Sequence, residues 1–240
     1  MTVLRVAQIF PVTEAEGPGK RFALWFQGCP LRCPGCCNPE FLPFRGGESK
    51  ALSEMIRLLE QTQSETRIEG VSLLGGEPFA VLNPGAAWPN KRWPAPRFGE
   101  VASFLRARHG LRSVVTWGPG EKMLAESVVS GSEGAAVMSP ALPLLDLVAL
   151  LRDARLMVSG DTGPTHIAGA LGVPIVSPFG PTSAARNGPW HPDDIVITKF
   201  DECECRYQRR CRVPDRWCLA RLPAAEMMAA ITRRLEAAAR

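Results

Sequence analysis

The sequence lacks the features that mark membrane-embedded, secreted or nucleic-acid-binding proteins. No apolar run reaches the ~18 residues needed to cross a bilayer, and the segment Met1–Arg5 lacks the long apolar stretch of a secretory signal. No internal repeat or low-complexity linker interrupts the chain. The net charge of +4 is a small surplus, whereas nucleic acid usually demands a clustered basic face. We therefore expect a cytoplasmic protein with no transmembrane segment and no nucleic-acid partner.

The residues that are present suit a globular protein with an uneven distribution of charge and cysteine. The 240 residues are 45% hydrophobic and 22% charged, which excludes disorder as the main state. Residues 1–80 hold 8 Lys and Arg and 9 Asp and Glu, whereas residues 81–240 hold 20 and 15. This basic surplus suits an anionic small molecule. Four of the 8 cysteines precede residue 40 and four follow residue 200, and such clusters in a cytosolic chain favour metal or redox chemistry.

The chain changes character near Phe79, which predicts two domains, residues 1–80 and 81–240. The first contains a strand at Phe22–Phe26, a cysteine cluster, a helix around Leu52–Leu59 and a strand at Val71–Leu74. In the second, strands and helices alternate along the sequence. Strands are predicted at 81–83, 113–117, 135–138, 156–159 and 173–176, and helices at 98–109, 121–130, 144–151, 164–171 and 223–235. This alternation predicts an open parallel α/β sheet with its ligand at the carboxyl ends of the strands.

Three cysteines lie close together in the first domain. Cys29, Cys33 and Cys36 fall within eight residues, and the intervening prolines and glycine favour a loop in which the sulfur atoms converge. Three thiolates on a four-iron cluster leave one iron open to a substrate or cofactor. The alternative is a zinc loop with Cys37 as the fourth ligand, although the adjacency of Cys36 and Cys37 is awkward for one ion.

This part of the chain resembles the radical S-adenosylmethionine enzymes, notably the activator of anaerobic ribonucleotide reductase. The matching stretches are EGPG at 16–19, WFQGC at 25–29, NPE at 38–40 and the cysteine loop. The resemblance implies that Cys29, Cys33 and Cys36 bind a 4Fe-4S cluster. It also implies that Gly75, Gly76 and Glu77 hold S-adenosylmethionine. The match stops after Glu77, so we expect only a fragment of the family's βα barrel and doubtful turnover.

Residues 81–240 resemble the C-terminal domain of family 9 glycosyltransferases, the heptosyltransferases of lipopolysaccharide synthesis. The matching stretches are LNPGAAWPNKRWP at 82–94, WGPGE at 117–121, SGDTGPTH at 159–166, FGPT at 179–182 and NGPW at 187–190. The resemblance implies a Rossmann-like parallel sheet, the C-terminal half of a GT-B fold. It further implies that the nucleotide sugar is bound by residues in these stretches, namely Lys91, Glu121, Asp161, Thr162, Gly163 and His166.

The chemistry of these residues agrees with a sugar-diphosphate donor. Asp161, Thr162 and Gly163 follow a strand and open a helix, where free N–H groups and the helix dipole favour phosphate. Lys91 follows a glycine loop and can neutralise the leaving nucleoside diphosphate. Glu121 can accept hydrogen bonds from ribose hydroxyls. The alternatives are that Asp161 is only a helix cap, that His166 is an interior histidine, and that Glu121 merely suits a helix start.

The late cysteines Cys203, Cys205, Cys211 and Cys218 lie among arginines and carry no clear signature. Structural zinc, a disulfide and a basic surface loop all remain open.

Three functions follow from the two resemblances. One is a heptosyltransferase-like module that binds an ADP-sugar, with lipopolysaccharide core as acceptor and the inner membrane as a peripheral contact. Such a module is an enzyme by resemblance but inactive alone, because the family's catalytic base lies in an N-terminal domain for which this chain has no matching motif. The second is a glycyl-radical-activating enzyme with a replaced C-terminal part. The third is an inactive fusion product.

Overall fold

The computed structural model describes residues 3–29, 37–43, 45–75, 79–213 and 217–238. Contacts divide the chain into two compact units, Met1–Glu77 and Pro78–Arg240. Within the described residues, no helix is long and apolar enough to cross a membrane.

The first unit is an open four-stranded sheet in the order β3-β1-β2-β4. Its strands are β1 (Val3–Thr13), β2 (Arg21–Phe26), β3 (Glu48–Ala51) and β4 (Gly70–Gly75). Strand β1 is antiparallel to both β2 and β3, whereas β2 and β4 are parallel. The described part of this unit is thus a mixed sheet, and it does not display the predicted fragment of a parallel βα barrel. The sequence did not predict β1 and β3, and their antiparallel pairing differs from the parallel strands of a βα barrel.

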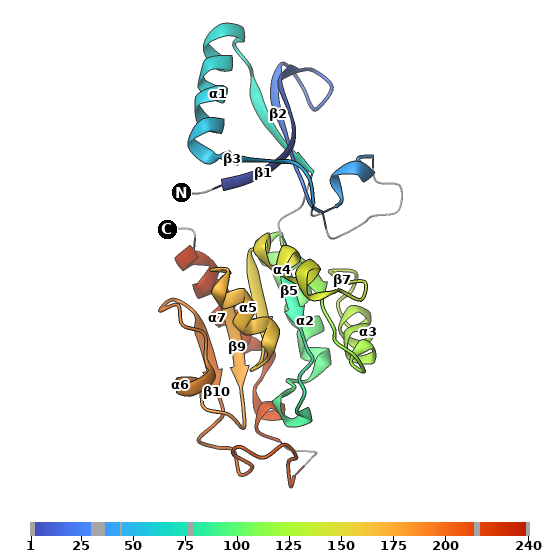
Figure 1. The fold of residues 1–240 in the computed structure, drawn as a ribbon, viewed down its shortest axis with the longest axis vertical. Helices are drawn as coiled ribbons and strands as arrows, with labels where there is room; N and C mark the ends of the chain where they lie inside the picture. Colours follow the sequence, from blue (N-terminus) through green and yellow to red (C-terminus); the bar gives the residue numbers. More distant parts are fainter. Residues whose placement is uncertain (1–2, 30–36, 44, 76–78, 214–216, 239–240) are drawn as a thin grey trace. The chain divides into compact units, whose positions relative to one another are not determined.

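One helix, α1 (Leu52–Thr66), packs on this sheet (Figure 1). Its apolar side chains meet those of the strands in a small core formed by Val6, Phe22, Leu24, Met55 and Ile68. A short 3-10 helix, η1 (Pro39–Phe41), follows the cysteine loop.

The second unit is a six-stranded parallel sheet in the order β10-β9-β8-β5-β6-β7. Its strands are β5 (Phe79–Asn83), β6 (Arg112–Val115), β7 (Ala136–Met138), β8 (Leu156–Ser159), β9 (Ile175–Phe179) and β10 (Ile195–Thr198). Every residue of the central strands β5 and β8 is buried, as expected for a sheet covered on both faces. The predicted parallel α/β fold is confirmed. The boundary predicted after residue 80 falls inside β5, because Phe79 and Ala80 already pair with β6.

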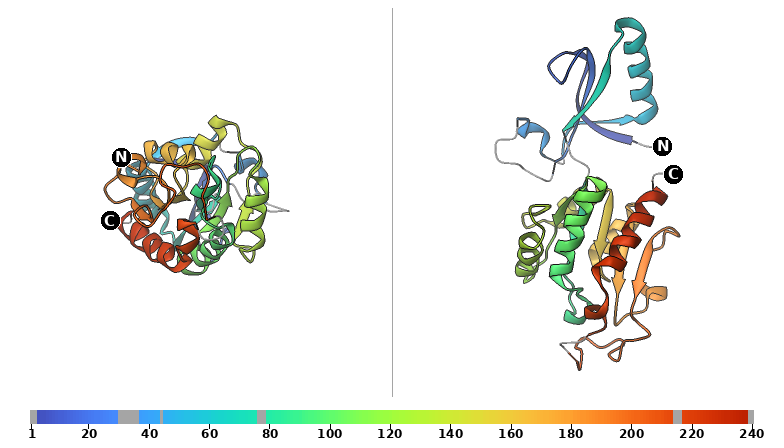
Figure 2. Two further views of the ribbon diagram at one scale, coloured as in Figure 1. Left: turned by 90° about the horizontal axis from the view of Figure 1, so that it is seen from below. Right: turned by 180° about the vertical axis from the view of Figure 1, so that it is seen from behind.

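Helices cover both faces of this sheet (Figures 1 and 2). Helices α2 (Ala95–His109) and α7 (Ala224–Ala238) lie on one face with α3 (Lys122–Ser130) beside α2, whereas α4 (Leu144–Arg152) and α5 (Gly163–Ala170) lie on the other. A short α6 (Ala184–Asn187) follows β9, and the 3-10 helices η2 (Pro89–Lys91) and η4 (Cys218–Arg221) complete the described set. The predicted stop at Gly110 is confirmed: it has φ +67° and its N–H bonds to carbonyls of the last turn of α2.

Candidate functional site

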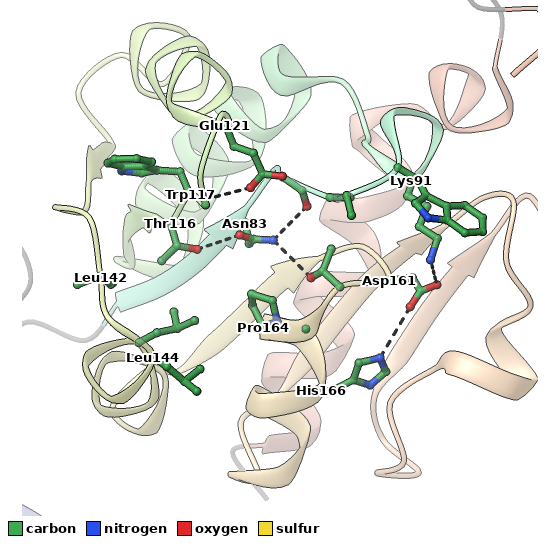
Figure 3. A pocket seen from close by; sticks show the side chains of 18 residues that line it. Asn83, Lys91, Thr116, Trp117, Glu121, Leu142, Leu144, Asp161, Pro164 and His166 are labelled. Atoms are coloured by element: carbon green, nitrogen blue, oxygen red, sulfur yellow. Dashed lines mark hydrogen bonds and ion pairs between the residues drawn. The ribbon is translucent and has the colours of Figure 1, made fainter. Parts of the chain in front are cut away.

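A cavity of about 580 Å³ opens at the carboxyl ends of β5, β6 and β8 in the second unit (Figure 3). The chain runs from β5 outward to β6 and β7, then returns to the opposite side of β5 with β8. The order of the strands therefore reverses at β5, and ligands of parallel sheets bind at such a switch point. All six second-unit residues predicted from the sequence line this cavity: Lys91, Glu121, Asp161, Thr162, Gly163 and His166.

Polar side chains converge on Asp161, which follows β8. Its Oδ2 accepts hydrogen bonds from Lys91 Nζ at 2.6 Å, from Thr182 Oγ1 at 2.7 Å and from Asn187 Nδ2 at 3.0 Å. Burial acts to raise the pKa of Asp161, but the hydrogen bonds from Lys91, Asn187 and Thr182 outweigh it, so the pKa lies below its ordinary value. Asp161 is therefore a carboxylate at neutral pH.

The helix-cap alternative for Asp161 is wrong. The N-cap position of α5 belongs to Thr162, and the Asp161 carboxylate bonds across the loop to Lys91, Thr182 and Asn187. The sequence predicted neither Thr182 nor Asn187 as site residues, although both lie in stretches that carried the family resemblance. Their contact with Asp161 depends on how the β9–α6 connection folds beside β8, which local sequence does not reveal.

Lys91 is held on the cavity wall by two neighbours. Its ammonium pairs with Asp161 and lies 4.4 Å from the centre of the Trp88 ring. A cation in this position gains both an ion pair and a cation–π contact. The short helix η2, in the loop that follows β5, places Lys91 here.

The start of α5 offers open space to a ligand. A Cβ added at Gly163 would meet no atom of the described residues within 4 Å. Gly163 begins the helix, so its N–H has no partner within α5. The Thr162 hydroxyl lies within 3.0 Å of Ser159 Oγ and 3.2 Å of Thr165 Oγ1, which fixes this turn to the end of β8.

His166 lies one turn into α5, and the interior-histidine alternative is wrong. Its side chain is 45% exposed, and its Nε2 is 3.8 Å from Asp161 Oδ1 (Figure 3). The imidazole can therefore reach both Asp161 and a molecule in the cavity.

Glu121 occupies the opposite side of the cavity, in the loop between β6 and α3. Its Oε2 accepts a hydrogen bond from the Gly118 N–H at 3.0 Å, and its Oε1 is 3.6 Å from Arg92 Nη2. It stands at the N-cap position of α3 but makes no side-chain capping bond within the described structure. A Cβ at Gly85 would lie 2.0 Å from Glu121 Oε2, so glycine at this position is needed for the approach.

Several cavity residues were not predicted from the sequence. Asn83 is buried at the end of β5, where it accepts a hydrogen bond from Thr116 Oγ1 and donates to Gly85 O and Ser159 Oγ. An apolar wall is formed by Trp117, Leu142, Leu144 and Leu147 (Figure 3). Asn83 stood within a matching stretch, whereas Leu142 precedes α4, Leu144 and Leu147 lie in its first turns, and none of the three belongs to a motif.

In the first unit, two predicted site residues lie in the described part. Cys29 follows β2 as a half-buried free thiol, and Gly75 ends β4 with φ +94°. Because Phe26 pairs with Gly75, the two positions lie at the same edge of the sheet. Cys33, Cys36, Gly76 and Glu77 fall outside the described residues. Among the described residues, no group of three or more His, Cys, Asp or Glu side chains is arranged to hold a metal ion.

Comparison with known proteins points to one family for most of the chain. Lipopolysaccharide heptosyltransferase 1 of Pseudomonas aeruginosa is 33% identical over 137 residues, covering 57% of this chain and 38% of that protein. The solved structure of E. coli ADP-heptose lps heptosyltransferase II matches with a TM-score of 0.58 at 22% identity, covering 70% of this chain and 50% of that chain, which shows a shared fold. This chain therefore spans less than half the length of the curated heptosyltransferase.

A smaller part of the chain has a different relative. The anaerobic ribonucleoside-triphosphate reductase-activating protein of Escherichia coli K12 is 34% identical over 78 residues, covering 32% of this chain and 50% of that protein. This likeness supports the resemblance to radical S-adenosylmethionine activating enzymes over a limited stretch. The profile of glycosyltransferase family 9, by contrast, matches residues 48–215. Because that match covers more than half of the sequence, the chain belongs to glycosyltransferase family 9 (heptosyltransferase).

Proposed function

We propose that the second unit binds a nucleotide-diphosphate sugar of the ADP-heptose type and serves as the donor half of a heptosyltransferase. The observation that carries this proposal is the convergence of Lys91, Asp161 and the start of α5 on one cavity at the switch point of the sheet. The related E. coli protein named for ADP-heptose shares this fold.

The diphosphate is assigned to the start of α5. The N–H of Gly163 and the positive end of the helix dipole attract phosphate oxygens, and the open space beside Gly163 admits them. Lys91 supplies a full positive charge that neutralises the nucleoside diphosphate as its bond to the sugar breaks. Asp161 positions the Lys91 ammonium, and Thr182 and Asn187 in turn orient Asp161.

The nucleoside is assigned to the side of the cavity where Trp117 and the three leucines lie. This apolar wall suits a planar base. Glu121 lies on the same side, and its carboxylate can accept hydrogen bonds from ribose hydroxyls. The sugar then extends toward His166 and the open side of the cavity.

Transfer to an acceptor needs a base within hydrogen-bond reach of the acceptor hydroxyl. The family resemblance places that base in an N-terminal domain, and the first unit carries no motif that matches it. We therefore propose that this chain binds the donor and transfers no sugar unaided. For an assembled enzyme, the acceptor is the lipopolysaccharide core, reached at the cytoplasmic surface of the inner membrane.

Calorimetry with ADP, an ADP-sugar and UDP tests the donor site. We expect ADP and the ADP-sugar to bind more tightly than UDP, and Lys91→Ala to weaken both. Lys122→Ala is the matched control, since Lys122 is exposed, pairs with Glu126 and does not line the cavity. Absence of ADP binding, or equal effects of the two lysine variants, contradicts the proposal. Radiolabelled transfer to a lipid-A-core acceptor by the purified chain contradicts its second part.

A second candidate function belongs to the first unit. We propose that Cys29, Cys33 and Cys36 hold a 4Fe-4S cluster and that Gly75, Gly76 and Glu77 hold S-adenosylmethionine. The supporting observation is that Cys29 follows β2 and Gly75 ends β4, so both lie at the carboxyl ends of two neighbouring parallel strands. A Cβ at Gly75 would lie 2.4 Å from the Phe26 carbonyl oxygen, so this position has no room for a side chain. Such a cluster would supply the electron that cleaves S-adenosylmethionine to a 5′-deoxyadenosyl radical.

A further inference from the structure

The four late cysteines gather in one loop of the second unit. Cys203, Cys205 and Cys218 are buried, Cys211 is half-buried, and all four are free thiols. Gly180, at the end of β9, lies against them: a Cβ there would be 2.8 Å from Cys218 Sγ. Neither proposed function uses these thiols.

Two of the four thiols are in direct hydrogen-bond contact. Cys205 Sγ donates a hydrogen bond to Cys211 Sγ at 3.4 Å, whereas Cys203, Cys211 and Cys218 line one cavity. Within the part of the chain that the structure describes, no group of three or more such side chains has the arrangement of a metal site. A disulfide needs its two sulfur atoms about 2.05 Å apart. The Cys205 and Cys211 sulfur atoms are 3.4 Å apart, so a small movement of the segment between them brings them to bonding distance.

The two sulfur atoms of this pair differ in accessibility. Cys211 is partly open to solvent beside a cavity of about 330 Å³ that Cys203 and Cys218 also line. Cys205 is fully buried and accepts a hydrogen bond from the Arg212 N–H at 3.1 Å. A small disulfide reagent therefore reacts with Cys211 first, and Cys205 can react only with the mixed disulfide formed on Cys211.

The segment between these cysteines supports the loop that carries Lys91. Gln208, which lies between Cys205 and Cys211, accepts a hydrogen bond from Asn90 Nδ2 at 2.8 Å through its carbonyl. The guanidinium of Arg209 lies 5.9 Å from the ring centre of Trp88, on which Lys91 also stacks. Any constraint on the segment from 205 to 211 thus acts on the backbone beside Lys91.

We propose that Cys205 and Cys211 form a reversible disulfide by exchange with a low-molecular-weight disulfide, and that its closure holds the Trp88–Arg92 loop in place. The disulfide itself is independent of the proposed donor site. Only its significance for nucleotide binding rests on that proposed function.

The exchange balances in two displacements. The Cys211 thiolate attacks one sulfur of an external disulfide, breaking its S–S bond, forming a mixed disulfide and releasing one thiolate. The Cys205 thiolate then attacks the Cys211 sulfur, forms the internal S–S bond and expels the second thiolate. The two protons of the protein thiols pass to the two released thiolates, so the protein is oxidised by two electrons and the reagent is reduced to two thiols.

Peptide mapping after treatment with oxidised glutathione tests the pairing. Trypsin cleaves after Arg206, Arg209 and Arg210, so a disulfide between Cys205 and Cys211 joins two peptides that separate on reduction. The variant Cys203→Ser with Cys218→Ser should give the same joined peptides, because it keeps the proposed pair. Cys211→Ser should abolish them. Joining of Cys203 to Cys218 instead, failure of any late cysteine to pair, or a purified protein with one zinc or iron ion held by these thiols would overturn the proposal.

Hydrogen exchange tests the effect on the Lys91 loop without any ligand. In the oxidised protein, we expect slower exchange in peptides covering residues 88–92 than in the reduced protein, with no change in the first unit. Equal exchange in the two states would overturn the coupling while leaving the disulfide intact. Because no nucleotide is added, a failed donor site cannot produce either result.

Discussion

At the scale of single residues, the second-unit cavity depends on Asp161. Its carboxylate is the shared acceptor for an ammonium from the stretch after β5 and for a hydroxyl and an amide from the stretch between β9 and β10. The Asp161 side chain is only 7% exposed. Without its carboxylate, these three donors would lose their acceptor in a place where little water can replace it. Removal of Asp161 therefore affects Lys91, Thr182 and Asn187 together.

The first prediction concerns Asp161→Ala. We expect the second unit to remain folded but to lose about 2–3 kcal/mol of unfolding free energy, since a charged hydrogen-bonded partner of Lys91 disappears. Affinity for the ADP-sugar should fall by about tenfold or more, equivalent to ~1.4 kcal/mol. Urea denaturation and calorimetry measure the two effects. Asp193→Ala, which removes an exposed carboxylate near His191, should change neither, and unchanged affinity in Asp161→Ala would contradict the assignment.

The second prediction follows from the pKa of Asp161. Burial acts to raise this pKa, but the hydrogen bonds together lower it by more. The pKa in the folded protein therefore lies below the pKa in the unfolded chain. The stability due to the ionised carboxylate is present above the unfolded pKa of ~3.9 and is lost as the pH falls through the folded pKa. The difference in unfolding free energy between wild type and Asp161→Asn should be constant near neutral pH and shrink in acid. A difference that grows as the pH falls would show the opposite sign.

The third prediction separates stability from binding at two glycines. A Cβ at either Gly163 or Gly110 would meet no described atom within 4 Å, but only Gly110 has a positive φ, at +67°. Gly163→Ala should keep or raise the melting temperature and weaken the ADP-sugar, because the methyl group enters the space assigned to diphosphate. Gly110→Ala should lower stability by about 1 kcal/mol through backbone strain and leave binding unchanged. If Gly163→Ala binds normally, the diphosphate does not lie at this turn.

At the scale of elements, the sequence predicted the parts of the second unit whose patterns are local. Strand β8 has the predicted bounds, and α5 begins one residue before the predicted Pro164. Strand β10 was missed because it is a short, half-exposed strand at the sheet edge. The apolar wall was missed for a different reason: Leu142 comes just before α4 and Leu144 begins it, and only the packing of α4 brings them to the cavity.

The first unit shows the same limit more strongly. The parallel pairing of β2 with β4 follows from two apolar strands separated by a helix, and both strands were predicted. The antiparallel β1 and the short β3 were not: among the β1 side chains whose burial is described only Val6 is buried, and β3 is the mostly polar stretch ESKA. Pairing between segments distant in sequence is decided by tertiary contacts, which propensity does not register.

At the scale of the whole molecule, each unit has a core of its own. The fourth prediction is that residues 78–240 fold without the first unit and unfold in one cooperative transition. A fragment that begins at Val81 should be less stable by about 3–5 kcal/mol, since it loses Phe79, a side chain that is only 2% exposed. Circular dichroism during thermal unfolding compares the two fragments. Equal stability would mean that β5 effectively begins at Val81, and an unfolded 78–240 fragment would refute independent folding.

The fifth prediction concerns the first unit within the full chain, which also carries the four late cysteines. Reconstitution with iron and sulfide without oxygen should yield acid-labile sulfide and the absorbance of thiolate-bound iron. The triple variant Cys29→Ala, Cys33→Ala and Cys36→Ala should lose both signals, because three thiolates are needed to leave one iron open. A variant with Cys203, Cys205, Cys211 and Cys218 all changed to serine should keep them.

Zinc without labile sulfide in protein purified without oxygen would favour the zinc-loop alternative. Signals that vanish only in the serine variant would move the iron site to the second unit and remove the reason for assigning S-adenosylmethionine to Gly75, Gly76 and Glu77.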